Sequence, residues 1–151
     1  CNRFAEQAAL HPGPKCLTHN DFRPDNMMFA TPAGGHPFMM LDWQSFAVGT
    51  GAVDVAYFLA GAITREERHE HERELLTIYH DKLKALGVKN YSFDDLMQDY
   101  RTGAFLLFFT AFFASMVVIQ TPRGDDMFFQ MIRSSSNHII DHGALDILKA
   151  L

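Results

Sequence analysis

A chain of 151 residues is long enough for one domain and can bury roughly 68–70% of its unfolded surface. Apolar residues make up 48% of the chain, and a net charge of −5 without a basic block excludes nucleic acid as the main partner. The two cysteines, Cys1 and Cys16, have neither a metal-ligand spacing nor the pattern of a disulfide framework, so we expect a cytoplasmic protein.

The first elements of the chain are short. Residues 2–10 favour a helix that ends at the Pro-Gly-Pro sequence of residues 12–14, and residues 15–18 predict a strand. The chain opens with Cys1 rather than Met and without a signal-peptide pattern. We therefore expect it to be a piece of a longer chain.

The predicted strand leads into a polar loop with the spacing His-x-Asp-x-x-x-x-Asn, formed by His19, Asp21 and Asn26. A later apolar run ends abruptly at Asp42. Phosphoryl transfer needs one carboxylate that accepts the proton of the attacking hydroxyl, together with an amide oxygen and a second carboxylate that hold magnesium on the nucleotide phosphates. Each residue alone also fits a turn or a strand end, but those alternatives leave the spacing unexplained.

Two strands, residues 27–30 and 38–41, are predicted to form a hairpin around a turn that contains a glycine pair. A hairpin brings its two ends together. It would place Asn26, before the first strand, beside Asp42, after the second. Two ligands of one magnesium ion require this proximity.

Residues 45–51 predict a glycine-containing loop, and residues 52–63 are apolar enough for a buried helix with Asp54 in its first turn. The helix dipole favours a carboxylate at that position. Asp54 is therefore either a simple N-terminal charge or a residue that holds a neighbouring segment.

A capping-box pattern at residues 64–67 opens a densely charged helix that runs to about residue 86. His69 and His71 are two residues apart and point to different sides of a helix, so a solvated face is expected there rather than a metal site. His138 and His142 have the spacing i, i+4, but we expect structural or surface histidines there as well.

The next helix is capped by Ser92 and includes an apolar stretch at residues 104–119. Its 16 residues are fewer than the ~20 needed to cross a bilayer, so no stable membrane insertion is expected. A core helix surrounded on all sides is the simplest interpretation. Alternatively, Phe105, Phe109 and Phe112, or a neighbouring stripe, line an acceptor pocket beside Asp21, and an aromatic wall would suit a lipophilic or amphipathic alcohol. After a second helical segment, residues 141–143 are expected to interrupt the last helix.

The octet from His19 to Asn26 resembles the catalytic loop of the protein-kinase-like superfamily, and Asp42-Trp43-Gln44 is similar to its second metal-binding motif. With residues 51–59 it looks most like the aminoglycoside phosphotransferase and choline/ecdysteroid-kinase-like families. Protein kinases follow the metal-binding aspartate with a long activation loop that ends in Ala-Pro-Glu. Here only eleven residues separate Asp42 from Asp54 and no Ala-Pro-Glu follows, which favours a small-molecule kinase.

The resemblance implies an α+β fold: the mostly α-helical C-terminal lobe of a protein-kinase-like domain, with a small β-hairpin carrying the catalytic and metal loops. The lobe would span residues 1–151. The N-terminal nucleotide-binding lobe, with its Gly-rich loop and strand lysine, would be its missing intramolecular partner. The implied activity is ATP-dependent phosphorylation of a hydroxyl of a small-molecule alcohol, and the isolated lobe is expected to be inactive.

The same resemblance assigns roles to the loop residues. Asp21 would orient and deprotonate the acceptor hydroxyl, Asn26 and Asp42 would bind the Mg²⁺ of ATP, and Arg23 would offset charge that develops on the transferred group. These assignments form the predicted catalytic and metal site.

A supporting role is implied for Asp54, which would hold the catalytic loop through backbone amides, with His19 as its structural partner. Asn20 stands where the small-molecule branch often has glycine, a departure that affects the backbone freedom of the loop. The alternative from another functional class is a non-catalytic, pseudokinase-like or isolated-lobe module that binds a partner through the face an N-terminal lobe would cover.

Overall fold

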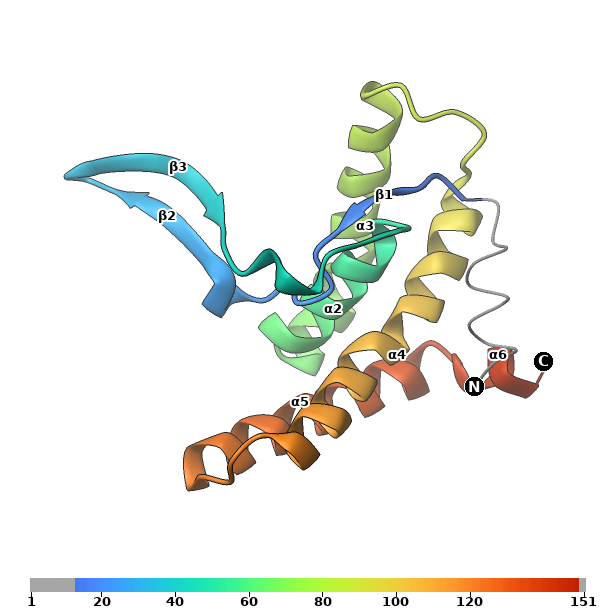
Figure 1. The fold of residues 1–151 in the computed structure, drawn as a ribbon. Helices are drawn as coiled ribbons and strands as arrows, with labels where there is room; N and C mark the ends of the chain where they lie inside the picture. Colours follow the sequence, from blue (N-terminus) through green and yellow to red (C-terminus); the bar gives the residue numbers. More distant parts are fainter. Residues whose placement is uncertain (1–12, 150–151) are drawn as a thin grey trace.

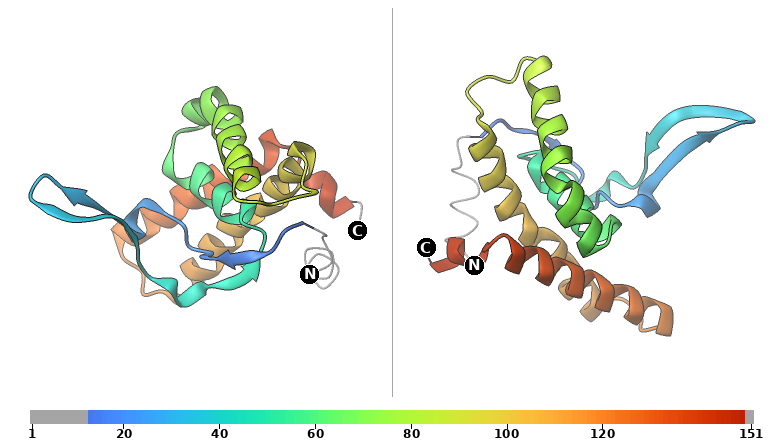
Figure 2. Two further views of the ribbon diagram at one scale, coloured as in Figure 1. Left: turned by 90° about the horizontal axis from the view of Figure 1, so that it is seen from above. Right: turned by 180° about the vertical axis from the view of Figure 1, so that it is seen from behind.

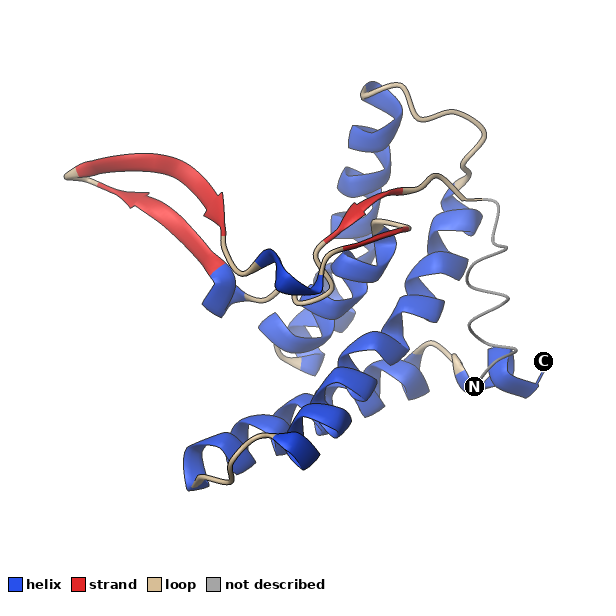
Figure 3. Ribbon diagram, in the orientation of Figure 1, coloured by secondary structure: helices blue, strands red, loops and turns tan. Residues whose placement is uncertain are grey.

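The computed structural model describes residues 13–149, and the predicted helix over residues 2–10 lies outside them. The fold is α+β and mostly helical, as predicted (Figures 1 and 3). The strands and helices, apart from two short 3₁₀ turns, are β1 (Cys16–Thr18), β2 (Met27–Thr31), β3 (Gly34–Met40), β4 (Ala47–Gly49), α2 (Ala52–Ala62), α3 (Arg65–Ala85), α4 (Phe93–Val117), α5 (Pro122–Asp141) and α6 (Leu145–Lys149).

Strands β2 and β3 form the predicted antiparallel hairpin, which projects from the helical body (Figures 1 and 2). Met27 pairs with Met40, and the register shifts beyond Phe29. Gly34 and Gly35 turn the chain with φ of 111° and 119°, a conformation that glycine adopts without a steric penalty. Strand β3 begins at Gly34, whereas the strand was predicted to begin at residue 38, after Pro37. An edge strand can include a proline, so Pro37 does not delay its start.

A second strand pair joins β1 to β4, with Leu17 opposite Val48. The prediction of an unbroken loop over residues 45–51 was wrong, since residues 47–49 are a strand. This pairing brings the start of the catalytic loop beside the segment that follows Asp42. The Thr18 hydroxyl strengthens the pairing by donating to the Ala47 carbonyl at 3.1 Å.

Helix α2 is the centre of the helical body and crosses α4 closely. Ala52 and Ala56 are buried at the crossing. A Cβ added at Gly103 would lie 2.9 Å from the Val53 Cα and 3.0 Å from the Ala56 Cβ. Any residue larger than glycine at this position would therefore force the two helices apart. The helix therefore holds Asp54 in a rigid frame.

Helix α3 begins at the predicted capping box, with the Thr64 side chain and the Glu67 side chain each bonded to the other's backbone nitrogen. It ends before Gly87, whose φ is 96°. The expectation that its charged stretch is a solvated face was wrong at Arg68, which is only 2% exposed. Arg68 is buried because carboxylates of α3 and α5 surround its guanidinium.

Helix α4 is not surrounded on all sides. Residues such as Tyr100 and Leu107 are buried, but Phe113 and Val117 are 57% and 81% exposed, so the core-helix prediction was wrong for the last turns. Within residues 13–149, α4 is the one helix long and apolar enough to cross a membrane by length and composition, with 33% of its most apolar window buried. The absence of stable membrane insertion stays a prediction.

Candidate active site

The catalytic-loop segment is held at its start by the Asp54 carboxylate, which projects from the first turn of α2. Its Oδ2 accepts from the His19 backbone N–H at 2.7 Å, and its Oδ1 accepts from the Asn20 backbone N–H at 2.8 Å. Asn20 has a φ of 62°, in the left-handed region. Glycine adopts this conformation most readily, and asparagine is among the residues that adopt it next most often. Its side-chain amide also donates to the Ser45 carbonyl at 2.8 Å.

The His19 imidazole is buried and connects the two predicted loops. Its Nε2 donates to the Leu41 carbonyl at 2.7 Å, and its Nδ1 accepts from the Asp21 backbone N–H at 3.2 Å. The edge of the Trp43 ring packs against it, with ring centroids 4.8 Å apart. Two opposite hydrogen-bonding roles fix which ring nitrogen carries the proton. The backbone N–H of His19 makes the contact with Asp54. The imidazole ring of His19 is hydrogen-bonded to the backbones of Leu41 and Asp21 instead.

The Asp21 carboxylate lies between two donors. Its Oδ1 accepts from the Tyr57 hydroxyl at 2.7 Å, and its Oδ2 accepts from the Asn26 side-chain amide at 2.9 Å. Burial and the hydrogen bond to Asp21 raise the pKa of Tyr57 well above its ordinary value, so Tyr57 keeps its proton and donates a hydrogen bond to the carboxylate. These two hydrogen bonds therefore fix the orientation of the Asp21 carboxylate.

Asn26 and Asp42 are brought together by the closing hydrogen bond of the hairpin, in which the Leu41 N–H donates to the Asn26 carbonyl at 2.8 Å. The Asn26 amide nitrogen is used by Asp21, which leaves its amide oxygen to face a cation. Asp42 is exposed, has a φ of 59°, and makes no side-chain capping bond. An amide oxygen and a carboxylate are the oxygen ligands that magnesium prefers, so these residues fit the ion.

Arg23 lies within the loop and forms an ion pair with Asp25 of the same loop. Its Nη2 and Nε donate to the Asp25 Oδ2 at 2.7 and 2.9 Å, and the guanidinium also contacts the sulfur atoms of Met127 and Met131 on α5. The predicted role of Arg23 in offsetting transferred charge stays a prediction.

The predicted site residues all lie within one segment that a family model matches. The model for the ecdysteroid kinase-like family matches residues 7–93, more than half of the chain. This chain belongs to the ecdysteroid kinase-like family. Comparison with curated proteins and with solved structures gave no match. The family is kinase-like, which supports a phosphotransferase class and agrees with the resemblance carried by the octet and by Asp42.

A cavity of about 730 Å³ opens beside the catalytic loop of this ecdysteroid kinase-like chain. Its walls combine apolar and charged side chains from the loop, α2, α3 and α5, including Phe22, Arg23, Tyr57, Phe58, Met131 and Arg133. Tyr57 connects the cavity to the site, because this residue lines the cavity and its hydroxyl donates to Asp21, which does not itself line the cavity.

The predicted aromatic wall was wrong. Phe105 packs in the core with Ile139 and Ala144, while Phe109 and Phe112 are 41% and 45% exposed, and none of the three lines this cavity. Residues i and i+4 on a helix share a face, but periodicity alone does not say whether that face meets a core, a cavity or solvent.

Tyr57 is the site residue that sequence reasoning missed. The available signal was its position three residues after Asp54 on the same helix, since residues at i and i+3 lie on one face. If Asp54 reaches the catalytic loop, a long polar side chain one turn later reaches it as well.

Proposed function

We propose that this chain carries the catalytic centre of an ATP-dependent phosphotransferase that phosphorylates a hydroxyl of a small molecule. The observation that best supports this proposal is the position of the Asp21 carboxylate, which accepts hydrogen bonds from the Tyr57 hydroxyl and the Asn26 amide near the cavity. Membership of a kinase-like family supports the same reaction class.

Each residue then has a chemical task. Asp21 orients the acceptor hydroxyl and takes its proton. Asn26 and Asp42 would hold magnesium, which when bound offsets the charge of the ATP phosphates. Asp54 and His19 keep the loop in place through the hydrogen bonds described above, so the base does not need to reorganise during the reaction.

The acceptor is proposed to be an amphipathic alcohol. Phe58, Leu107 and Met131 offer apolar walls in the cavity, whereas Arg65 and Arg133 supply polar groups at its border. A ring system or chain with a hydroxyl directed to Asp21 suits such a lining.

The nucleotide is proposed to bind on the side formed by β1, β4 and the hairpin, where an N-terminal lobe of the same protein would cover it. Apolar side chains are exposed along that side. They include Leu17, Phe29, Phe38, Trp43, Phe46 and Val48. An apolar surface of this extent is typical of one that another domain covers.

The test is phosphate transfer by the full-length gene product, with ATP, Mg²⁺ and a panel of lipophilic, amphipathic and cationic alcohols. The variant Asp21→Ala should lower kcat/KM by about 10²–10⁴, because a positioned general base contributes that much. The control Asp81→Asn removes an exposed carboxylate of α3 and should leave the rate unchanged. Equal rates for wild type and Asp21→Ala would exclude Asp21 as the base, and absence of transfer by wild type to every acceptor would favour the non-catalytic binding module.

A further inference from the structure

A group of potential metal ligands lies on α3 and at the end of α5, outside the catalytic loop. Glu72 projects from α3, His138 lies in the last turn of α5, and His142 follows the end of that helix. One ligand atom of each lies within 4.8 Å of the other two. The His142 Nε2 and a Glu72 carboxylate oxygen are already 2.9 Å apart.

His138 has an unusual environment for a histidine. Its side chain is fully buried, and neither ring nitrogen has a hydrogen-bond partner within residues 13–149. The ring packs against Tyr100 and His142, with centroid distances of 4.7 and 4.9 Å. A buried ring nitrogen without a partner is costly, and a bond from its lone pair to a ligand would remove that cost.

We propose that Glu72, His138 and His142 form a binding site for a divalent transition metal, with Zn²⁺ as the ion that fits best. Two imidazole nitrogens and one carboxylate oxygen are a ligand set of the kind that zinc takes, with the fourth position left to water. The two histidines share a helix face because they are four residues apart. The proposal does not rest on the proposed phosphotransferase, although Arg68, which contacts Glu72 and His142, also lines the cavity.

The geometry requires a local rearrangement of side chains. Ligand atoms bound tetrahedrally at about 2.1 Å from zinc are about 3.4 Å apart, so a separation as wide as 4.8 Å must close by about 1.4 Å. The Tyr100 hydroxyl donates to the same Glu72 oxygen at 2.6 Å and would orient the carboxylate from behind. A bound ion would cross-link α3 to α5.

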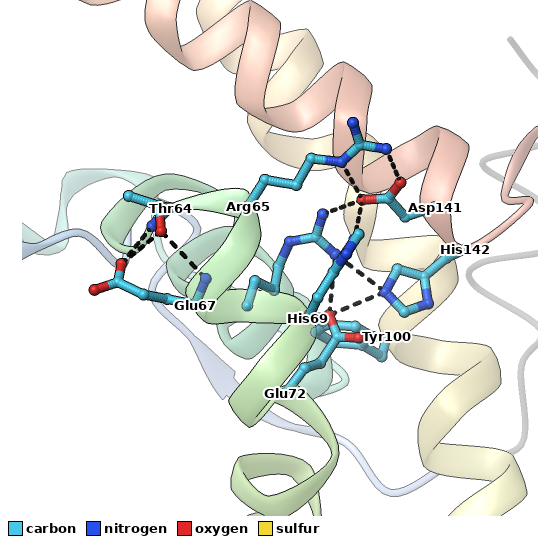
Figure 4. Close-up of polar contacts among 9 residues, drawn as sticks. Thr64, Arg65, Glu67, His69, Glu72, Tyr100, Asp141 and His142 are labelled. Carbon is cyan, nitrogen blue, oxygen red and sulfur yellow. Dashed lines mark hydrogen bonds and ion pairs between the residues drawn. The ribbon is translucent and has the colours of Figure 1, made fainter.

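Arg68 is a built-in competitor for the ion. Its Nη1 lies 3.2 Å from the Glu72 oxygen and 3.4 Å from the His142 Nε2. Its Nη2 is held by Asp141, which also binds Arg65 and His69 (Figure 4). An incoming cation therefore displaces one nitrogen of the guanidinium while the contact with Asp141 remains.

The experiment measures Zn²⁺ binding by calorimetry on the full chain after treatment with a chelator. Wild type should bind one equivalent, with a rise in melting temperature. Each of His138→Ala and His142→Ala should weaken binding at least tenfold and abolish that rise. The control His71→Ala, an exposed histidine outside the group, should bind as wild type does. Co²⁺ in place of Zn²⁺ should give the visible absorption of a tetrahedral site.

Two further results guard against a folding artefact. Circular dichroism checks that each variant keeps the helical content of wild type. Arg68→Met removes the competing cation and should tighten Zn²⁺ binding, a gain that loss of structure does not produce. Failure of wild type to bind Zn²⁺, or equal binding by wild type, His138→Ala and His142→Ala, would overturn the proposal.

Discussion

Asn20 and Asp42 both have a left-handed backbone, and each begins a turn that the predicted chemistry depends on. A residue with a Cβ and no side-chain compensation pays about 1–2 kcal/mol for this conformation. Asparagine and aspartate tolerate it better than most residues, which explains how Asn20 can adopt a conformation that glycine favours.

At Asn20, the variant Asn20→Ala should lower the free energy of unfolding by about 1–2 kcal/mol, because alanine disfavours φ of 62° and the bond to the Ser45 carbonyl is lost. Asn20→Gly keeps the backbone freedom and should cost less. Urea denaturation of both variants measures the difference. Equal losses would show that the backbone conformation is not the cause.

At Tyr57, the change to phenylalanine removes only the hydroxyl that donates to Asp21. A hydrogen bond to a charged group is worth about 1.5–3 kcal/mol, so kcat/KM of the full-length enzyme should fall about tenfold or more. Steady-state kinetics test this expectation, with Tyr79→Phe as the control for loss of a tyrosine hydroxyl elsewhere. An unchanged kcat/KM would mean that Asp21 is oriented without Tyr57.

At Asp42, the change to asparagine keeps a residue that tolerates the left-handed backbone but removes the carboxylate charge. The Mg²⁺ concentration for half-maximal phosphate transfer should rise at least tenfold, because a neutral amide is a weaker magnesium ligand. A magnesium titration at saturating ATP gives the result. If the midpoint does not move, Asp42 is not a ligand.

Among the elements, the hairpin, α2 and the capped starts of α3 and α4 could be predicted because their signals are local: alternating apolar runs, an apolar block, and Ser or Thr three residues before an acidic residue. Strand β4 could not, since its three residues form a strand only through pairing with β1 about 30 positions earlier. The exposed end of α4 was missed for a related reason, because sequence does not show where a neighbouring helix stops covering it.

The crossing of α2 and α4 allows a matched pair of glycine substitutions. Gly103→Ala should destabilise the fold by about 1–3 kcal/mol, because the added Cβ meets backbone and side-chain atoms of α2 at 2.9 and 3.0 Å. Gly61→Ala, whose Cβ meets only a flexible leucine atom at 3.4 Å, should be neutral or stabilising, since alanine favours helices. Thermal unfolding compares them. Similar effects would mean that the crossing can relax.

Across the whole molecule, the contacts between α3 and α5 make stability depend on pH. Hydrogen bonds from Arg65, His69 and Arg68 hold the pKa of Asp141 well below its ordinary value. Burial opposes ionisation of Glu72, but hydrogen bonds from His142 and Tyr100 outweigh it and lower its pKa to about 2. Carboxylates with lowered pKa stabilise the fold above pH 4.5, and that stabilisation is lost as the pH falls.

Protonation of His138 also lowers the stability of the fold as the pH falls. Burial, and then the charge of Arg68, lower its pKa from 6.5 to about 3, so the unfolded chain binds a proton that the folded chain rejects. The free energy of unfolding of the metal-free protein should therefore fall between about pH 6.5 and 3. Urea denaturation over this range measures it. A flat profile would show that His138 is protonated without cost.

The residues of the candidate site could be predicted to lie together because they are concentrated in residues 19–54, where spacing carries information. The group around Arg68 could not, because its members come from α3, α4 and α5 and meet only after folding. Spacing did bring His138 and His142 to notice, but nothing in the sequence placed Glu72 next to them.

The buried imidazole of His19 gives the molecule a mechanical property. The Nε2 atom of His19 donates to the Leu41 carbonyl, immediately before Asp42, and the Nδ1 atom accepts from the Asp21 N–H. A displacement of the projecting hairpin is therefore transmitted to Asp21 through this rigid ring. The hairpin and the loop that contains Asp21 are thus connected through the His19 ring. Displacement of one of these segments should also displace the other, so the fluctuations of the Asp21 loop and of the Asp42 loop in solution should be correlated.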